Sequence, residues 1–378
     1  MSEYQYYEFQ AIDRPLDAKE MAELRSYSTR ARITPTSFVN DYSWGSFKGD
    51  VDACMERYFD AFLYLANWGT HVLKLRLPAR LLEAKTAGQY CAGEQASVRE
   101  KNGKVILTFV SEDEEGGEWV EDAGRLSSLI SARTELGRGD LRALYLGWLL
   151  CAQSGDLDDD DVEPPVPDGL TELSASLASF TEFLRVDPDL VRVAAAASRP
   201  LVDSETKSED VRAWLAKLAV DEKDDLLARM IAGDAALASE LIQHMRRARG
   251  AGADRVPSRR RTVAELLRAA EHAADERRRI EAETAAEEKR RRTRETAAAR
   301  RKHLDKLAGT EPVLWNRVEE LVATKQPKRY DDAVAVLTDL RDLAERTDGA
   351  DFRRRLEALR AEHGRKPTLI ERLHKAGL

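Results

Sequence analysis

Residues 97–110, SVREKNGKVILTFV, carry the strongest local fold signal in this 378-residue chain. Two runs rich in β-forming residues flank Asn102 and Gly103, and both of these residues tolerate the positive φ angles of a type I′ turn. The stretch therefore predicts a β-hairpin. Residues 71–78, HVLKLRLP, come shortly before it and alternate between apolar and polar positions, which predicts another strand.

The residues before this hairpin predict an α+β domain over residues 1–120. Three segments have in turn the pattern of a strand, a helix, and a hairpin or bulged strand: YQYYEFQAI (4–12), RPLDAKEMAELRSYS (14–28) and RARITPTSFVNDYSW (30–44). DVDACMERYFDAFLYLANWG (50–69) is predicted to be one helix, capped by Asp50 or Asp52 and closed by Gly69. This order favours an antiparallel sheet with two helices on one face, for which a ferredoxin-like arrangement is one solution.

A helical domain is predicted for residues 121–250. It follows an acidic, Gly-containing boundary, residues 111–124, and its helix DLRALYLGWLLCAQ (140–153) carries a wide apolar stripe. Short amphipathic segments joined by turns come next, as in a helical bundle or a solenoid-like array. A linker rich in Gly and Arg, residues 251–261, ends this part of the chain.

One long charged helix is predicted for residues 262–308. Thr262 and Glu265 form a capping box at its start, and no Gly or Pro interrupts it before Gly309. Past Ile280 the helix has almost no large apolar residue, so helix propensity and ion pairs between residues four apart must keep it folded. The favoured interpretation is a solvated spacer between the acidic body and the end of the chain.

Two other interpretations of this helix remain open. Its basic stretch, residues 289–302, would contact nucleic-acid phosphates through Arg290, Arg291, Arg292 and Arg294. Neighbouring Glu residues neutralise much of this charge, however, and no aromatic residues are interleaved for base stacking. The Ala-lined side of the helix would alternatively pair with a partner helix.

The last part of the chain, residues 310–378, predicts a helical, TPR-like end module built around an antiparallel helical hairpin. Its final segment, KPTLIERLHKAGL, places Leu369, Ile370 and Leu373 on a short helix. This segment is either an intramolecular staple or a docking peptide that binds a protein partner through these three residues.

The segment from about Arg261 to Leu378 contains RTVAELLRAAE, ARRKHLDKLAG, ATKQPKRYDDAVAVLTDLRDLAER and RKPTLIERLHKAGL. It resembles the tail of bacterial proteins that carry a SWIM-type zinc finger. Such a finger holds zinc with Cys and His, and this chain has no CxC followed by CxH, so neither zinc nor nucleic-acid binding carries over from the resemblance. A shared tail implies a common partner. The whole chain also resembles an uncharacterised bacterial family, which implies no activity.

No catalytic signature appears in the sequence. It contains no GxxxxGK phosphate loop, no GxGxxG after a strand, no GxSxG elbow and no HExxH. Of the six histidines only His71, which precedes a strand beside Trp68, stands out as a candidate for a role beyond the surface. The acidic run at residues 156–163 lacks the Gly and the bidentate Glu of a calcium loop, so we interpret it as a solvated linker. We expect no metal and no other cofactor.

The segment YSWGSFKGD (42–50) combines two glycines and three aromatic residues. A turn of this composition would expose Trp44 and Phe47 at a partner-binding surface. Core aromatic residues around a tight turn are the alternative.

Charge is unevenly distributed along the chain. The net charge is −8, but residues 1–258 carry −15, whereas residues 259–302 carry +6 and residues 303–378 carry +1. An acidic body is a poor partner for nucleic acid or an anionic membrane, because phosphate groups repel it. No apolar run approaches the roughly 18 residues of a membrane span.

These observations favour a non-enzymatic adaptor or scaffold protein of a cytosolic bacterial assembly. Three widely spaced cysteines, with no CxxC pair, fit the reducing conditions of the cytoplasm. The adaptor would bind another protein through its terminal modules. The alternative is a nucleic-acid-associated accessory protein that uses the basic helix 289–302.

Overall fold

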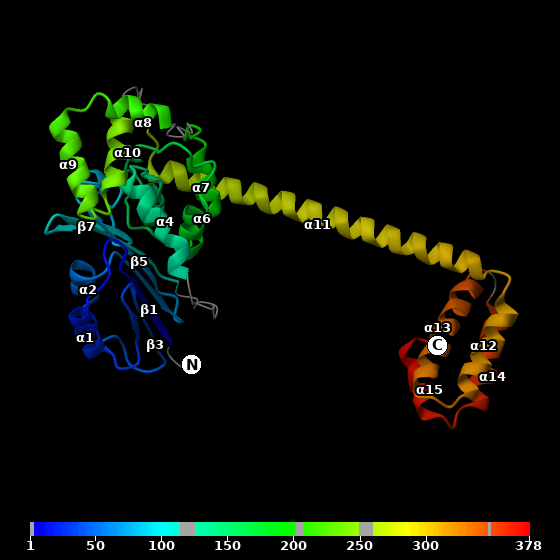
Figure 1. The fold of residues 1–378 in the computed structure, drawn as a ribbon. Coiled ribbons are helices and arrows are strands. Elements are labelled where there is room, and N and C mark those ends of the chain that lie inside the picture. The colour runs from blue at the N-terminus through cyan, green and yellow to red at the C-terminus, as the bar shows by residue number, and fades with distance from the viewer. Residues whose placement is uncertain (1–3, 114–124, 202–207, 249–259, 347–348) are drawn as a thin grey trace. The chain divides into compact units, whose positions relative to one another are not determined.

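The computed structural model describes residues 4–113, 125–201, 208–248, 260–346 and 349–378 (Figure 1). The chain divides into two compact units, Met1–Arg277 and Arg278–Leu378. The predicted acidic boundary falls largely on residues 114–124 and the predicted linker largely on residues 249–259, which lie outside the described part of the chain.

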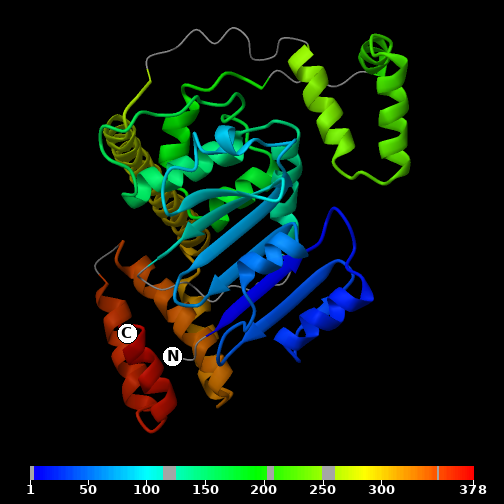
Figure 2. The ribbon, with the colours of Figure 1, turned by 90° about the vertical axis from the view of Figure 1, so that its left-hand side faces the viewer.

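The first unit contains a seven-stranded sheet, seen in Figure 2 as blue and cyan arrows side by side. Its order is β2-β3-β1-β4-β5-β7-β6, and all neighbouring strands are antiparallel. The prediction of an N-terminal antiparallel sheet is therefore confirmed. The strands are β1 (Gln5–Gln10), β2 (Arg32–Thr34), β3 (Ser37–Tyr42), β4 (Ala61–Ala66), β5 (His71–Pro78), β6 (Ala96–Lys101) and β7 (Lys104–Ser111).

Helices α1 (Ala18–Tyr27) and α2 (Val51–Arg57) make the crossover connections of this sheet. Helix α1 joins β1 to β2, which run parallel because both are antiparallel to β3 between them. Helix α2 joins β3 to β4 in the same way, with β1 between them. The predicted hairpin at Asn102 and Gly103 is also confirmed: it joins β6 to β7, and the two φ angles are 51° and 70°.

The prediction of one helix over residues 50–69 is wrong. Asp50 caps α2 by accepting from the backbone N–H of Asp52 and Ala53, but the helix ends at Arg57 and β4 follows. Both faces of β4 are covered, so its sequence AFLYLA is a continuous apolar run. A strand buried on both faces lacks the alternation that distinguishes a strand from a buried helix.

Helices cover both faces of the sheet. On one face α1 and α2 enclose a core rich in aromatic side chains, including Phe9, Phe38 and Phe59. On the other face the strands share a larger core with α4 to α7, and α5 contributes an unbroken run of buried residues from Arg142 to Ala152. In Figure 1 α1 and α2 accordingly lie on one side of the strands and α4 and α6 on the other.

The remaining helices of this unit come after β5. They are α3 (Ala84–Ala87), α4 (Arg125–Gly137), α5 (Arg142–Ser154), α6 (Ala175–Phe183), α7 (Pro188–Ala195), α8 (Ser208–Leu215), α9 (Val220–Ile231) and α10 (Leu237–Ala248). Helix α10 is tied to the body by Gln243, whose side-chain N–H groups donate to the carbonyls of Leu81 (2.7 Å) and Gly137 (2.8 Å).

The predicted long helix is α11 (Val263–Leu307). Its capping box forms as predicted: the Glu265 N–H donates to Thr262 Oγ1 (3.2 Å), and the Thr262 N–H donates to Glu265 Oε2 (3.1 Å). Val263, Leu266 and Ala270 are buried in the larger core of the first unit. Every residue from 277 to 299 is exposed.

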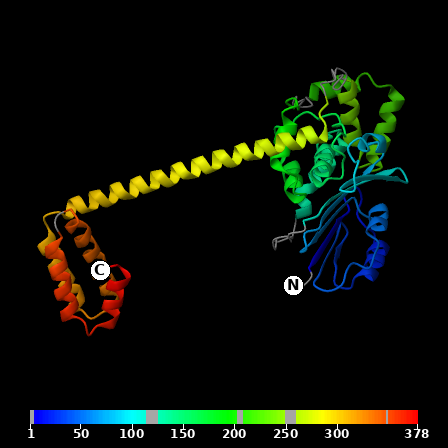
Figure 3. The same cartoon turned by 180° about the vertical axis from the view of Figure 1, so that it is seen from behind.

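The second unit has its own core, formed by α12 (Glu311–Ala323), α13 (Pro327–Ala344), α14 (Ala350–Glu362) and α15 (Pro367–Lys375), coloured orange to red in Figure 3. The end of α11 packs on α13: Leu304 is buried, and Arg300 pairs with Asp339 and Asp342.

Candidate functional site

Two exposed tryptophans lie in turns at one end of the sheet. Trp44 is 86% exposed in the turn after β3, and Trp68 is 45% exposed in the turn between β4 and β5. We call residues 43–46 the first tryptophan turn and residues 67–70 the second tryptophan turn. The described part of the chain has three other tryptophans: Trp148 and Trp315 are buried, and Trp214 is half-buried.

The strand register places the two turns on either side of β1. Tyr42 of β3 and Ala66 of β4 both pair with Gln5 of β1. Trp44 lies two residues after Tyr42, and Trp68 lies two residues after Ala66. Strands β3 and β4 are separated only by β1, so their backbones lie about 9.5 Å apart. Both turns therefore leave the sheet at the end where β1 begins, marked N in Figure 1.

A buried glutamine holds the first tryptophan turn. The Gln5 side-chain amide donates to the Gly45 carbonyl (2.9 Å), while its Oε1 accepts from the hydroxyls of Tyr7 (2.8 Å) and Tyr64 (3.2 Å). Burial raises the pKa of both tyrosines, so their hydroxyls stay protonated as donors. Gly45 has a φ of 76°, which a residue with a side chain adopts only with strain.

Phe47 anchors the other end of this turn. Its ring is only 9% exposed and packs against the rings of Phe9 and Phe38 at centroid distances of 5.6 Å. Of the two aromatic residues predicted for partner binding here, the structure exposes Trp44 and buries Phe47. Phe47 therefore fixes the position of the turn and offers no surface to a partner.

Backbone and side-chain hydrogen bonds hold the second tryptophan turn. Asn67 exchanges two hydrogen bonds with Tyr4, one through its Oδ1 (2.9 Å) and one through its N–H (3.0 Å). The Gly69 carbonyl accepts from Arg185 (2.8 Å). Gly69 has a φ of 100°, and a Cβ there would lie 2.2 Å from the Asp113 carbonyl oxygen, so no other residue fits without rearrangement.

Trp68 is not among the residues that the sequence predicts for partner binding. The signal was present, because SWG at residues 43–45 and NWG at residues 67–69 repeat a tryptophan followed by a glycine. The incorrect helix over residues 50–69 placed Trp68 at a helix end and hid this equivalence.

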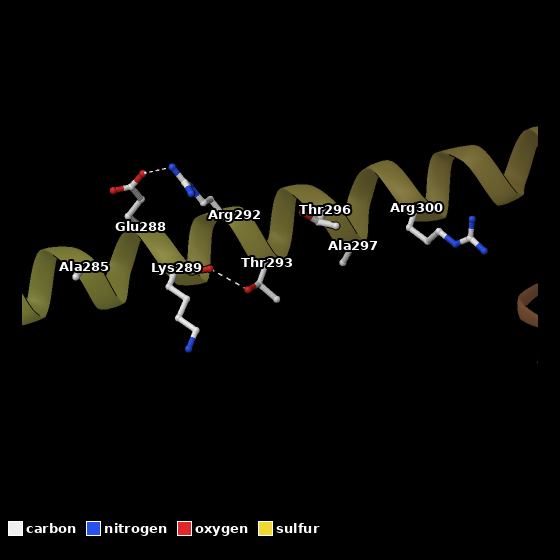
Figure 4. A pocket seen from close by; sticks show the side chains of 8 residues that line it. All are labelled: Ala285, Glu288, Lys289, Arg292, Thr293, Thr296, Ala297 and Arg300. Atoms are coloured by element: carbon white, nitrogen blue, oxygen red, sulfur yellow. Dashed lines mark hydrogen bonds and ion pairs between the residues drawn. The ribbon is translucent and has the colours of Figure 1, made fainter. Parts of the chain in front are cut away.

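The basic stretch of α11 presents its arginines in several directions. Arg290, Arg291 and Arg292 are consecutive, so their side chains leave the helix about 100° apart. Arg292 pairs with Glu288 (3.1 Å) and Arg291 with Glu295 (3.7 Å). Figure 4 shows one shallow strip of this helix, lined by small and charged side chains: Ala285, Glu288, Lys289, Arg292, Thr293, Thr296, Ala297 and Arg300.

The terminal leucines lie inside the second unit. Leu369 and Leu373 are fully buried in its core, and Ile370 packs partly buried against it. The segment is an intramolecular staple in this structure, which was one of the two interpretations. A partner would reach Leu369 or Leu373 only if α15 left the core.

The other candidates for chemistry already have internal partners. His71 Nδ1 lies 2.6 Å from the Phe183 carbonyl and its Nε2 lies 2.9 Å from Arg185. In the acidic run, Asp156 accepts from the Gln95 N–H (2.8 Å), and Glu163 binds Tyr145 and Arg261. Among the residues that the structure describes, no group of His, Cys, Asp or Glu could hold a metal ion.

All three cysteines are free thiols. Cys54 and Cys151 are buried and Cys91 is half-buried. Burial raises the pKa of Cys54 and Cys91 to about 12 and that of Cys151 to about 11.

Comparison with protein-family models, curated proteins and solved structures finds no match for this chain. Within the described ranges, no helix combines the length and the apolar character needed to cross a lipid bilayer.

Proposed function

We propose that this protein is a non-enzymatic adaptor that binds a protein partner through the two tryptophan turns. The observation that carries the proposal is the exposure of Trp44 and Trp68 on turns that hydrogen bonds from Gln5 and Arg185 hold in place. Tryptophan is enriched among the residues that contribute most to protein interfaces, because it offers a large apolar surface at a low cost in conformational entropy. A rigid turn reduces that cost further.

The second unit supports an adaptor because it has a core of its own, separate from the two cores of the first unit. Its resemblance to a tail shared among bacterial proteins adds that a second partner would bind there. Within this proposal α11 connects the two binding units, in a bacterial cytosolic assembly.

We also propose to class β1 to β4 as ferredoxin-like. Support comes from the two crossovers through α1 and α2, each with another strand between the strands that it joins. Strands β5 to β7 extend that sheet beyond β4.

A capture experiment with the full-length protein tests the adaptor. Immobilised wild type and the double variant Trp44→Ala/Trp68→Ala would be incubated with extract of the source cells, and retained proteins would be quantified by mass spectrometry. Ile231→Ala is the matched control, because Ile231 is 84% exposed on α9. We expect wild type and the Ile231→Ala control to retain at least one protein that the double variant does not retain. That protein, once purified, should bind purified wild type directly. Identical sets of retained proteins for all three would refute the proposal.

Binding of nucleic acid by residues 289–302 is the competing function. All of these side chains are at least partly exposed, which favours it, whereas the pairs of Arg291 and Arg292 with glutamates reduce the charge available to phosphates. A gel shift with duplex and single-stranded DNA at several salt concentrations separates the two functions. The adaptor should give no shift near physiological salt.

A further inference from the structure

We propose that the exposed stretch of α11 is an interface with a second copy of this chain, in which the two helices run antiparallel. This inference goes beyond the adaptor proposal, to which it would add bivalent binding, and it does not depend on that proposal. It rests on the order of the charges along one side of the helix, which makes that side complementary to itself.

One side of the exposed stretch carries residues that recur every three or four positions. Successive residues of a helix are about 100° apart, so residues at this spacing share one side. We call six of them the charge stripe: Ile280, Glu283, Glu287, Arg290, Arg294 and Ala297. All six side chains are exposed. The charge stripe is therefore acidic in its first half and basic in its second half.

The four charges of the stripe are not paired within the chain. Among the residues that the structure describes, none forms an ion pair with any of these four side chains. Instead, like charges lie four residues apart, Glu283 before Glu287. Arg290 and Arg294 repeat this arrangement with positive charge. Like charges at this spacing destabilise a helix, so a partner with the opposite charges would relieve both repulsions.

A second copy that runs in the opposite direction supplies those charges. A twofold axis between Glu288 and Lys289 brings together residues of the two stripes that are equally far from the axis. The facing pairs are Glu283 with Arg294, Glu287 with Arg290, and Ile280 with Ala297. Each pair occurs twice because the arrangement is symmetric. Every charge of the stripe thereby meets an opposite charge.

Charge disfavours the parallel arrangement of the same two helices. In parallel, the acidic half of one stripe would lie along the acidic half of the other, and the two basic halves would also meet. Charged residues at facing positions set the orientation of paired helices in this way. The order of the charges therefore selects the antiparallel pair.

The residues beside the stripe allow two helices to approach each other. The small ones among them are Thr284, Ala286, Thr293 and Ala298. Small side chains leave room for the long Glu and Arg side chains to reach across to the facing helix.

The charges at the ends of the stripe are compatible with this arrangement. The facing pairs there are Glu276 with Arg301 and Arg279 with Ala298. Arg277 and Arg300 are also equally far from the axis, but each already has a carboxylate in its own chain. Arg277 pairs with Asp189 (3.0 Å), and Arg300 pairs with Asp339.

A nucleic acid fits the charge stripe less well than a second copy does. The carboxylates of Glu283 and Glu287 would repel its phosphates, although Arg290 and Arg294 would attract them. A second copy satisfies both halves of the stripe at once.

Sedimentation of the full-length protein tests for the dimer. Exposed ion pairs contribute little individually and are screened by salt, so the dimer should dissociate on dilution and in high salt. We expect dimers to form with increasing protein concentration at an ionic strength of about 0.1 M. In about 1 M salt, where the screening length is only about 3 Å, the protein should be monomeric.

Reversal of charge tests whether the stripe forms the interface. Glu283→Arg/Glu287→Arg makes the stripe basic throughout, and Arg290→Glu/Arg294→Glu makes it acidic throughout. Each double variant alone should dimerise at least tenfold more weakly than wild type. An equal mixture of the two should dimerise again, because an all-basic stripe then faces an all-acidic one. This recovery also shows that neither variant has lost its fold.

A matched control reverses two charges on another side of the same helix. Glu288→Arg/Glu295→Arg changes the net charge as much as the basic stripe variant does. Glu288 pairs with Arg292 in its own helix, as Figure 4 shows, and lies away from the stripe. This control should dimerise within about threefold of wild type.

Cysteine cross-linking tests the orientation. Ile280→Cys and Ala297→Cys lie about 25 Å apart along one helix, but they face each other in the antiparallel pair. Under mild oxidation a mixture of the two variants should form a cross-linked dimer, whereas neither variant should do so alone. Wild type gives the background, because its native thiols are buried or half-buried.

Three outcomes would overturn the inference. The first is a monomer at every concentration at an ionic strength of about 0.1 M. The second is a dimer that either stripe variant leaves intact, or that the control weakens as much as they do. The third is cross-linking of each cysteine variant with itself and not with the other, which would indicate a parallel pair.

Discussion

The hydrogen bonds of His71 define its protonation state. A guanidinium group only donates, so Nε2 must accept from Arg185 and Nδ1 must carry the proton that it donates to the Phe183 carbonyl. The ring also stacks on Phe183 at a centroid distance of 5.0 Å. Burial, and after it the positive charge of Arg185, lower the pKa of His71 from 6.5 to about 4. The neutral imidazole is therefore a structural group that joins β5 to the end of α6.

This environment predicts that stability falls in mild acid. The pKa of His71 is lower in the folded protein than in the unfolded chain. The stability that the neutral His71 side chain contributes is therefore fully present above pH 6.5 and is lost as pH falls from there towards 4. Between pH 7 and pH 5 the free energy of unfolding should drop by about 1–2 kcal/mol through this residue. Urea unfolding of wild type and His71→Gln at both pH values measures it, because glutamine keeps polar groups but does not titrate. The same pH dependence in both proteins would contradict the assignment.

At the scale of single elements, two kinds of ion pair support α11, one just before its first residue and one along its exposed stretch. Two residues before the helix, Arg261 donates to both oxygens of Glu163 (2.6 and 2.9 Å). Glu163 is buried and also accepts from the Tyr145 hydroxyl. In the exposed stretch of α11 Glu288 pairs with Arg292, and both side chains are more than half exposed. Burial decides how much each pair contributes to the free energy of unfolding, because a charge left without its partner is costly only where water cannot reach it.

Two matched substitutions test this difference. Glu163→Ala leaves Arg261 partly buried without its carboxylate and should lower the free energy of unfolding by about 3 kcal/mol. Glu288→Ala removes one exposed pair and should change it by no more than about 0.5 kcal/mol. Urea unfolding monitored by circular dichroism compares the two variants with wild type. Similar losses for both would show that Glu163 does not fasten the start of α11.

The elements that the sequence predicts correctly are those with a local cause. The Asn102-Gly103 turn and the Thr262-Glu265 capping box depend on groups a few residues apart, and both form. The strand at residues 61–66 depends on its pairing with β1 and β5 and on the burial of both its faces. From the sequence alone its apolar run is equally compatible with a buried helix. For the same reason the sequence does not reveal that Trp44 and Trp68 share one end of the sheet.

At the scale of the whole molecule, buried side chains gather in separate sets. The sheet and the helices α4 to α7 share one core, α1 and α2 close a second core on the other face, and the second unit encloses a third. Periodicity along the chain identifies apolar faces but not which faces meet. The packing of α4 on β5, some fifty residues apart in the sequence, is therefore visible only in three dimensions.

Separate cores predict separate unfolding transitions. Calorimetry of the full-length protein should show more than one transition, because a multi-domain chain does not unfold as a single cooperative system. Leu373→Ala removes a fully buried side chain from the second unit and should lower the midpoint of one transition by about 10 °C or more. Val313→Ala, at a position 67% exposed on α12, is the control and should leave all midpoints nearly unchanged. A uniform shift of every transition with Leu373→Ala would show that the units unfold together.

The three native thiols of this protein should react only slowly with maleimide dyes. Such reagents attack thiolates, and pKa values of about 11 to 12 leave on the order of one thiol in ten thousand or fewer ionised at neutral pH. A single Ser46→Cys substitution, at an exposed position beside Trp44, would then take up the dye selectively in an otherwise native chain. Quenching of that dye would then report, in real time, the binding of a ligand to the two indoles.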